Sequence, residues 1–163
     1  MRTYREEYEY WLASDAVDAK TKEELRALEG NEQEIEGRFK AMLTFGTAGL
    51  RGIMGAGIGM MNVYTVRYAT QGLANLIISK GGQIGGDSKE GNGVAIAHDS
   101  RLNSRLYAEE AASVLAANGI RAYIFDDMRP TPELSFAVRE TDAACTAGRN
   151  QRTPRCGEQN TSR

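Results

Sequence analysis

The sequence predicts an α/β fold with three layers, in which a mixed, mostly parallel sheet lies between helices. Two apolar runs are typical of strands, a continuous one at 94–97 and a more alternating one at 120–125. Helical periodicity flanks them, most clearly from about 104 to 118, where Gly119 ends the pattern. This alternation of helices and strands requires a further strand after residue 140.

Composition limits the class of protein. The 163 residues suffice for one ordinary domain or for a piece of a larger enzyme. A formal charge of −2 gives no reason to expect nucleic acid or an anionic membrane as a partner. The charged start lacks the apolar region of a signal peptide, so we expect a cytoplasmic protein. The two cysteines, Cys145 and Cys156, fit neither a disulfide framework nor a metal site.

The first 44 residues are predicted to form a helical lead. The first helix has an aromatic face, which we expect to pack, and the residues at helical spacing are Tyr4, Tyr8, Trp11 and Leu12. Two capping-box patterns then predict the starts of two further helices. They are Thr21 with Glu24, and Asn31 with Glu34.

A glycine-rich segment at 45–59, FGTAGLRGIMGAGIG, follows the helical lead. Dense glycines allow backbone N–H groups to approach a ligand, and the planar fork of Arg51 suits phosphate oxygens. These features predict an anion-binding loop. The alternative is a glycine-rich turn with a solvated Arg51, because the spacing matches neither of the two phosphate motifs that have a known mechanism.

The next helix is predicted to begin after a cap at Asn62 or Thr65. Its apolar residues from Val66 to Ile77 keep a period close to 3.6. Gly72 lies inside this helix, where glycine costs about 1 kcal/mol relative to alanine. We therefore expect Gly72 to mark close packing against another element.

The strand at 94–97 runs into the polar residues His98, Asp99, Ser100 and Arg101. Ligands of open α/β sheets bind at the carboxyl edge, so we expect Arg101 and Asp99 to belong to a site. The alternative is an Asp-Ser turn with a surface arginine. His98 is the only histidine and has no evident catalytic partner, so we expect a polar residue at the strand end and not a general base.

Residues 141–163 break the pattern. They contain no Val, Ile, Leu, Met, Phe, Tyr or Trp. Such a segment buries too little apolar surface to offset its ordering entropy, so the composition predicts disorder. We therefore expect a domain that is interrupted near residue 140, as by a reading-frame shift or a truncated gene.

These segments together resemble the N-terminal domain of the α-D-phosphohexomutase family. The resemblance covers about residues 1–140 and rests on FGTAGLRGIMG, MNVYTVRYATQGLAN, HDSR and RPTPELSFAVRE, in that order. It is strongest to the bacterial phosphoglucomutases and phosphomannomutases that have a long helical lead. It implies a lead at 1–44, an incomplete first domain of a four-domain enzyme at 45–140, and an unrelated tail at 141–163.

The resemblance implies a phosphosugar substrate. Family members interconvert sugar 1-phosphate and 6-phosphate through a phosphoserine enzyme and a bisphosphate intermediate, and Mg²⁺ bridges the phosphoserine. The resemblance also implies that Thr47, Gly49 and Arg51 face the phosphoserine, with Arg51 as a phosphate contact. It places Arg101 near the active centre.

The groups that perform the family's chemistry have no counterpart here. The phosphoserine loop, Thr-Ala-Ser-His-Asn-Pro, should follow residue 140, where the sequence has CTAGRNQRTPRC instead. The aspartate-rich Mg²⁺ loop and the later domains are also missing, so we assign no catalytic and no metal-binding residue. We therefore expect a fragment that is inactive alone. The alternative is a non-catalytic module that binds a phosphosugar or a protein, and we expect self-association through surface that the missing domains would cover.

Overall fold

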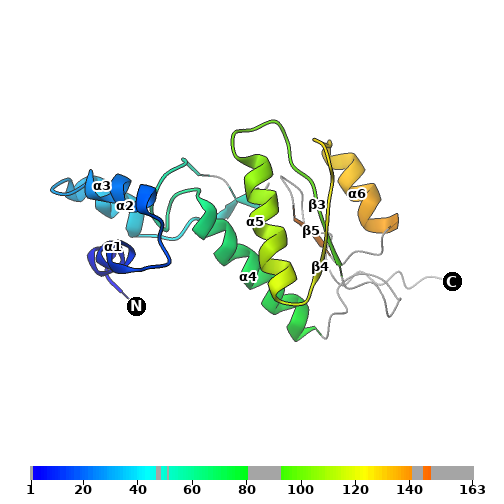
Figure 1. Cartoon of the computed structure of the whole chain (residues 1–163), viewed down its shortest axis with the longest axis horizontal. Helices are drawn as coiled ribbons and strands as arrows, with labels where there is room; N and C mark the ends of the chain where they lie inside the picture. The colour runs from blue at the N-terminus through cyan, green and yellow to red at the C-terminus, as the bar shows by residue number, and fades with distance from the viewer. Residues whose placement is uncertain (1, 47–48, 51, 81–92, 141–144, 148–163) are drawn as a thin grey trace. The chain divides into compact units, whose positions relative to one another are not determined.

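The computed structural model of the chain describes residues 2–46, 49–50, 52–80, 93–140 and 145–147. Helices and strands alternate along most of these residues (Figure 1). The helices are α1 (Tyr4–Ala13), α2 (Ala19–Arg26), α3 (Glu32–Phe39), α4 (Val63–Ser79), α5 (Ser104–Ala117) and α6 (Thr131–Glu140). The strands are β1 (Phe45–Gly46), β2 (Gly49–Leu50), β3 (Gly93–Ile96), β4 (Arg121–Ile124) and β5 (Cys145–Ala147).

The chain divides into two compact units. The first comprises Met1–Gly46 and Leu50–Thr65, and the second comprises Thr47–Gly49 and Val66–Arg163. The unit that holds the helical lead therefore continues to Thr65, whereas the sequence placed the boundary at residue 44.

Aromatic side chains form the core of the first unit. Tyr8 and Trp11 of α1 each meet Phe39 of α3 edge to face, with ring centroids 5.7 Å apart. Phe39 is 2% exposed, and Leu25 of α2 is fully buried beside these rings. The packing role that the sequence predicts for the aromatic face of the first helix is confirmed.

Helix α2 begins earlier than predicted, because Asp18 caps it. One carboxylate oxygen accepts the Thr21 N–H at 3.0 Å, and the other accepts the hydroxyls of Thr21 and Tyr64, both at 2.6 Å. These bonds, with the Thr21 hydroxyl foremost, hold the pKa of the Asp18 carboxyl well below its usual range. Thr21 lies inside the helix, so the capping box predicted for Thr21 and Glu24 is wrong.

Two other predicted caps are confirmed. Asn31 accepts the Glu34 N–H at 3.2 Å and begins α3. Asn62 accepts the Thr65 N–H at 2.9 Å, and the Thr65 hydroxyl accepts the Asn62 N–H at 3.1 Å. This reciprocal pair starts α4 in the manner of a capping box.

The second unit has three layers. Its sheet has the order β4-β3-β5, and both pairings are parallel, with Val94 opposite Ala122 on one side and Cys145 on the other. Helices α4 and α5 cover one face of this sheet, and α6 covers the other (Figure 1). The predicted three-layer α/β architecture is confirmed.

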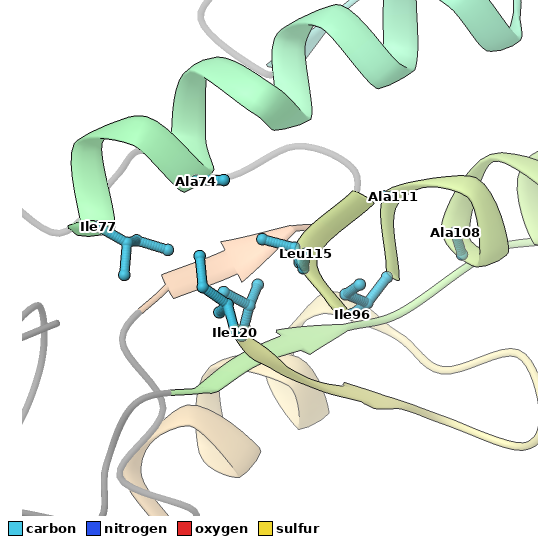
Figure 2. Packing of buried hydrophobic residues seen from close by; sticks show 8 residues of the cluster. Ala74, Ile77, Ile96, Ala108, Ala111, Leu115 and Ile120 are labelled. Carbon is cyan, nitrogen blue, oxygen red and sulfur yellow. The ribbon is translucent and has the colours of Figure 1, made fainter. Parts of the chain in front are cut away.

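Strand β3 is buried on both faces, as its continuous apolar run predicts. Val94 and Ile96 point into a core with α4 and α5, while Ala95 packs with Leu134 of α6. Figure 2 shows the larger of these cores, in which small residues of α4 and α5 let the helices approach the strand. Its members are Ala74, Ile77, Val94, Ile96, Ala108, Ala111, Leu115 and Ile120.

Strand β5 corrects the prediction for the tail. Residues 145–147 pair with β3 in parallel, so disorder from residue 141 onward is wrong for these three residues. Main-chain hydrogen bonds form the pairing and need no large side chains, which is why composition missed it. The strand also stands where the alternation of elements requires one. Residues 141–144 and 148–163 lie outside the described residues.

Candidate functional site

The centre of the glycine-rich segment lies outside the described residues. This holds for Thr47 and Arg51, two of the residues predicted to bind phosphate. Gly49, the third, begins β2, which pairs with β1. The anion-binding role of this part of the segment therefore stays a prediction.

The second half of the glycine-rich segment packs on the helical lead. The Ala56 N–H donates to Glu24 at 3.0 Å, and the Ala56 carbonyl accepts from Arg38 at 3.4 Å. Arg38 and Glu24 also form an ion pair at 2.5 Å. Burial acts to raise the pKa of the Glu24 carboxyl, but the Ala56 N–H and the Arg38 guanidinium outweigh it, so this pKa is lowered.

Two glycines of this half allow close backbone packing. Gly57 has φ +129°, and a Cβ there would lie 2.8 Å from the Arg38 carbonyl oxygen. A Cβ on Gly59 would lie 2.8 Å from the Ala41 carbonyl oxygen. The Gly59 N–H donates to the Arg38 carbonyl at 2.9 Å. Residues 55–59 thus match the alternative interpretation, a glycine-rich turn.

Arg101 lies where the sequence predicts it, in the turn between β3 and α5. The Asp99 carboxylate accepts the Arg101 N–H at 3.1 Å, and the Ser104 hydroxyl accepts the Asp99 N–H at 3.1 Å. These bonds fix the turn and leave the Arg101 side chain 62% exposed, with its Nε 3.7 Å from Asp99. The turn predicted as an alternative therefore exists, and its geometry presents the guanidinium to solvent at the carboxyl edge of the sheet.

His98 is buried beneath this edge. It is 6% exposed, and within the described residues neither ring nitrogen has a hydrogen-bond partner. The expectation that His98 is no general base stays a prediction.

Replacing His98 by Phe is expected to raise the free energy of unfolding by about 1 kcal/mol, because a buried polar group without a partner carries an uncompensated desolvation cost. Urea unfolding followed by circular dichroism measures the change, and His98→Leu provides a second apolar variant. Loss of stability in both variants would contradict the expectation.

Sequence reasoning missed Arg129, although the rule that found Arg101 also finds it. Arg129 follows β4 as Arg101 follows β3, and its N–H donates to the His98 carbonyl at 3.3 Å. Its side chain is 44% exposed and lies 3.5 Å from Glu133. The structure thus brings a second arginine to the edge that holds Arg101.

The described residues contain no group of three or more His, Cys, Asp or Glu side chains that could hold a metal ion. Their helices are also too short or too polar to cross a membrane.

Comparison with known proteins gives a consistent result. The family described as "Phosphoglucomutase/phosphomannomutase, alpha/beta/alpha domain I" matches residues 42–153, which is more than half of the chain and includes part of the predicted tail. A phosphoglucomutase of Staphylococcus saprophyticus is 42% identical over 108 residues, 66% of this chain and 18% of that protein. A human phosphopentomutase is 37% identical over 136 residues, 78% of this chain and 21% of that protein.

A phosphoglucomutase of Staphylococcus epidermidis is 35% identical over 133 residues, which cover 82% of this chain and 22% of that protein. The chain therefore spans about a fifth of the length of the curated relatives that it matches. No solved structure matches the chain significantly.

Proposed function

The chain belongs to the phosphoglucomutase/phosphomannomutase family through its domain I, and we propose that it provides the phosphate-facing first domain of a hexose phosphate mutase. The reaction is the interconversion of hexose 1-phosphate and 6-phosphate through a phosphoserine enzyme and a bisphosphate intermediate. Relatives named phosphoglucomutase support this choice of substrate. The phosphopentomutases among the relatives make pentose phosphates the nearest alternative substrates.

One observation carries the proposal, the exposed Arg101 guanidinium at the carboxyl edge of a parallel sheet. In phosphoryl transfer the protein mainly positions the phosphate and stabilises its charge, and arginine suits both tasks. We assign Arg101 to a phosphate oxygen of the sugar phosphate. Thr47, Gly49 and Arg51 are assigned to the same phosphate region on the resemblance alone.

In the proposed function, Mg²⁺ binds only in family members that carry the aspartate-rich loop. The described residues do not fit such a site, because they bring no three carboxylate or imidazole groups together. No step here depends on the metal. A cytoplasmic location also belongs to the proposal.

We expect the 163-residue chain alone to show no mutase activity, because the Thr-Ala-Ser-His-Asn-Pro motif with the nucleophilic serine does not occur in the sequence. A coupled assay from glucose 1-phosphate with Mg²⁺ measures this, with the phosphoglucomutase of Staphylococcus saprophyticus as the positive control. Magnesium-dependent turnover by the chain would contradict the assignment of catalysis to the missing groups.

The alternative function is a non-catalytic module that binds a phosphosugar or docks to another protein. Exposed apolar side chains on α4 favour it, namely Tyr68, Leu76 and Ile78. A module of the docking kind would self-associate or precipitate. Light scattering that finds a stable monomer, with no rise in melting temperature on adding glucose 1-phosphate, would count against the module.

A further inference from the structure

Two arginines stand at the carboxyl ends of neighbouring parallel strands. Arg101 follows β3, and Arg129 follows β4. The chain beyond β4 stays beside the chain beyond β3, since the Phe125 N–H donates to the Ile96 carbonyl at 3.2 Å and the Arg129 N–H donates to the His98 carbonyl at 3.3 Å. The backbone of Arg129 is thus bonded to His98, which precedes Arg101 by three residues.

Both guanidinium groups are loosely paired. Arg101 lies 3.7 Å from Asp99, and Arg129 lies 3.5 Å from Glu133. The other seven ion pairs among the described residues have distances between 2.5 and 3.3 Å. Within the described residues, neither guanidinium donates a hydrogen bond, so each keeps its donors for a ligand.

Arg105 follows Arg101 by four residues and, unlike Arg101, donates side-chain hydrogen bonds to other residues. It lies in the first turn of α5 and is 57% exposed, similar to Arg101. Its Nε donates to Glu109 at 2.8 Å, and its NH1 nitrogen donates to the Asp126 carbonyl at 2.8 Å. Arg105 is therefore committed to protein partners and supplies a matched control.

We propose that Arg129 acts with Arg101 as a two-arginine site for a phosphate monoester. The choice of ligand rests on the proposed function. A phosphate monoester carries close to two negative charges at pH 7, and two guanidinium forks match that charge and offer bidentate hydrogen bonds. The phosphate replaces the carboxylates of Asp99 and Glu133 as the partner of the arginines, because the contacts of these carboxylates to the arginines are long. Arg129 precedes Pro130, which restricts its backbone to extended conformations and limits the freedom lost on binding.

The test measures dissociation constants by NMR titration of the full chain at fixed ionic strength, with inorganic phosphate and glucose 1-phosphate as probes and glucose as the uncharged control. Arg129→Gln and Arg101→Gln are each expected to weaken binding of both phosphates about tenfold, the effect of losing charge-assisted hydrogen bonds. Arg105→Gln is expected to change binding less than twofold. Arg129→Lys keeps the charge without the fork and is expected to retain part of the affinity.

The outcomes separate this inference from the proposed function. If Arg101→Gln weakens binding and Arg129→Gln behaves like Arg105→Gln, the role of Arg129 is wrong and the phosphate contact of Arg101 stands. If the wild-type chain binds neither phosphate, both fail. Equal weakening by all three glutamine variants would indicate attraction by net charge and would also overturn the two-arginine site.

Discussion

Replacing Phe39 by Ala is expected to lower the free energy of unfolding of the first unit by about 3–5 kcal/mol. Phe39 is 2% exposed and packs edge to face against Tyr8 and Trp11 at 5.7 Å. The substitution removes buried apolar surface, leaves a cavity and breaks both aromatic contacts. Because these rings join α1 to α3, the loss should separate the helices of the lead.

Trp11 is the only tryptophan of the chain, so its fluorescence during urea unfolding reports directly on this cluster. Tyr10→Ala provides the control, because Tyr10 lies in the same unit, is 49% exposed, and its truncation should cost no more than about 1 kcal/mol. A cost below about 1 kcal/mol for Phe39→Ala would contradict the packing of the helical lead.

Replacing Gly57 by Ala is expected to destabilise the first unit by about 3 kcal/mol. Gly57 has φ +129°, which side-chain-bearing residues rarely adopt, and the new Cβ would lie 2.8 Å from the Arg38 carbonyl oxygen. Strain and overpacking therefore act together, and the contacting atom belongs to the backbone of α3, which cannot swing away. The measurement is again urea unfolding followed by Trp11 fluorescence.

Gly72→Ala is the matched control and should raise the free energy of unfolding by up to about 1 kcal/mol. Gly72 lies inside α4, is exposed, and has no heavy atom of the described residues within 4 Å of an added Cβ. The close packing predicted for Gly72 from the sequence is therefore wrong. If Gly57→Ala and Gly72→Ala had equal effects, the close approach of the segment to α3 would be refuted.

Local signals explain why most of the fold could be predicted. Asn31 and Asn62 cap helices through bonds to residues three positions away, and the apolar run of β3 follows from its burial on both faces. Each of these signals lies within a few residues of the element it specifies. The cap at Asp18 is equally local, since Asp18 accepts the Thr21 N–H three positions away, and it was missed because Thr21 and Glu24 also fit a capping-box pattern one turn later.

The wrong predictions concern features that depend on backbone far away in the sequence. Composition cannot tell a glycine that approaches a ligand from one that approaches a helix, and Gly57 and Gly59 are of the second kind. The alternation of elements requires a strand at β5, but composition does not reveal it, because β5 forms through main-chain pairing to β3. Gly72 was misjudged because helical periodicity does not show what covers each face.

The candidate site could likewise be predicted only in part. A rule about strand ends located Arg101, because parallel strands place their carboxyl ends at one edge regardless of the rest of the chain. The same rule would have found Arg129 if the strand before it had been followed to its end. Thr47 and Arg51 lie outside the described residues, so their roles stay predictions.

The most direct test of the phosphate role maps the amide shifts of the isotopically labelled chain as glucose 1-phosphate is added. We expect the shifts to concentrate at the carboxyl edge of the sheet, in residues 98–101 and 126–129, and glucose to cause none there. Shifts confined to other parts of the chain, or equal shifts with glucose and glucose 1-phosphate, would contradict it.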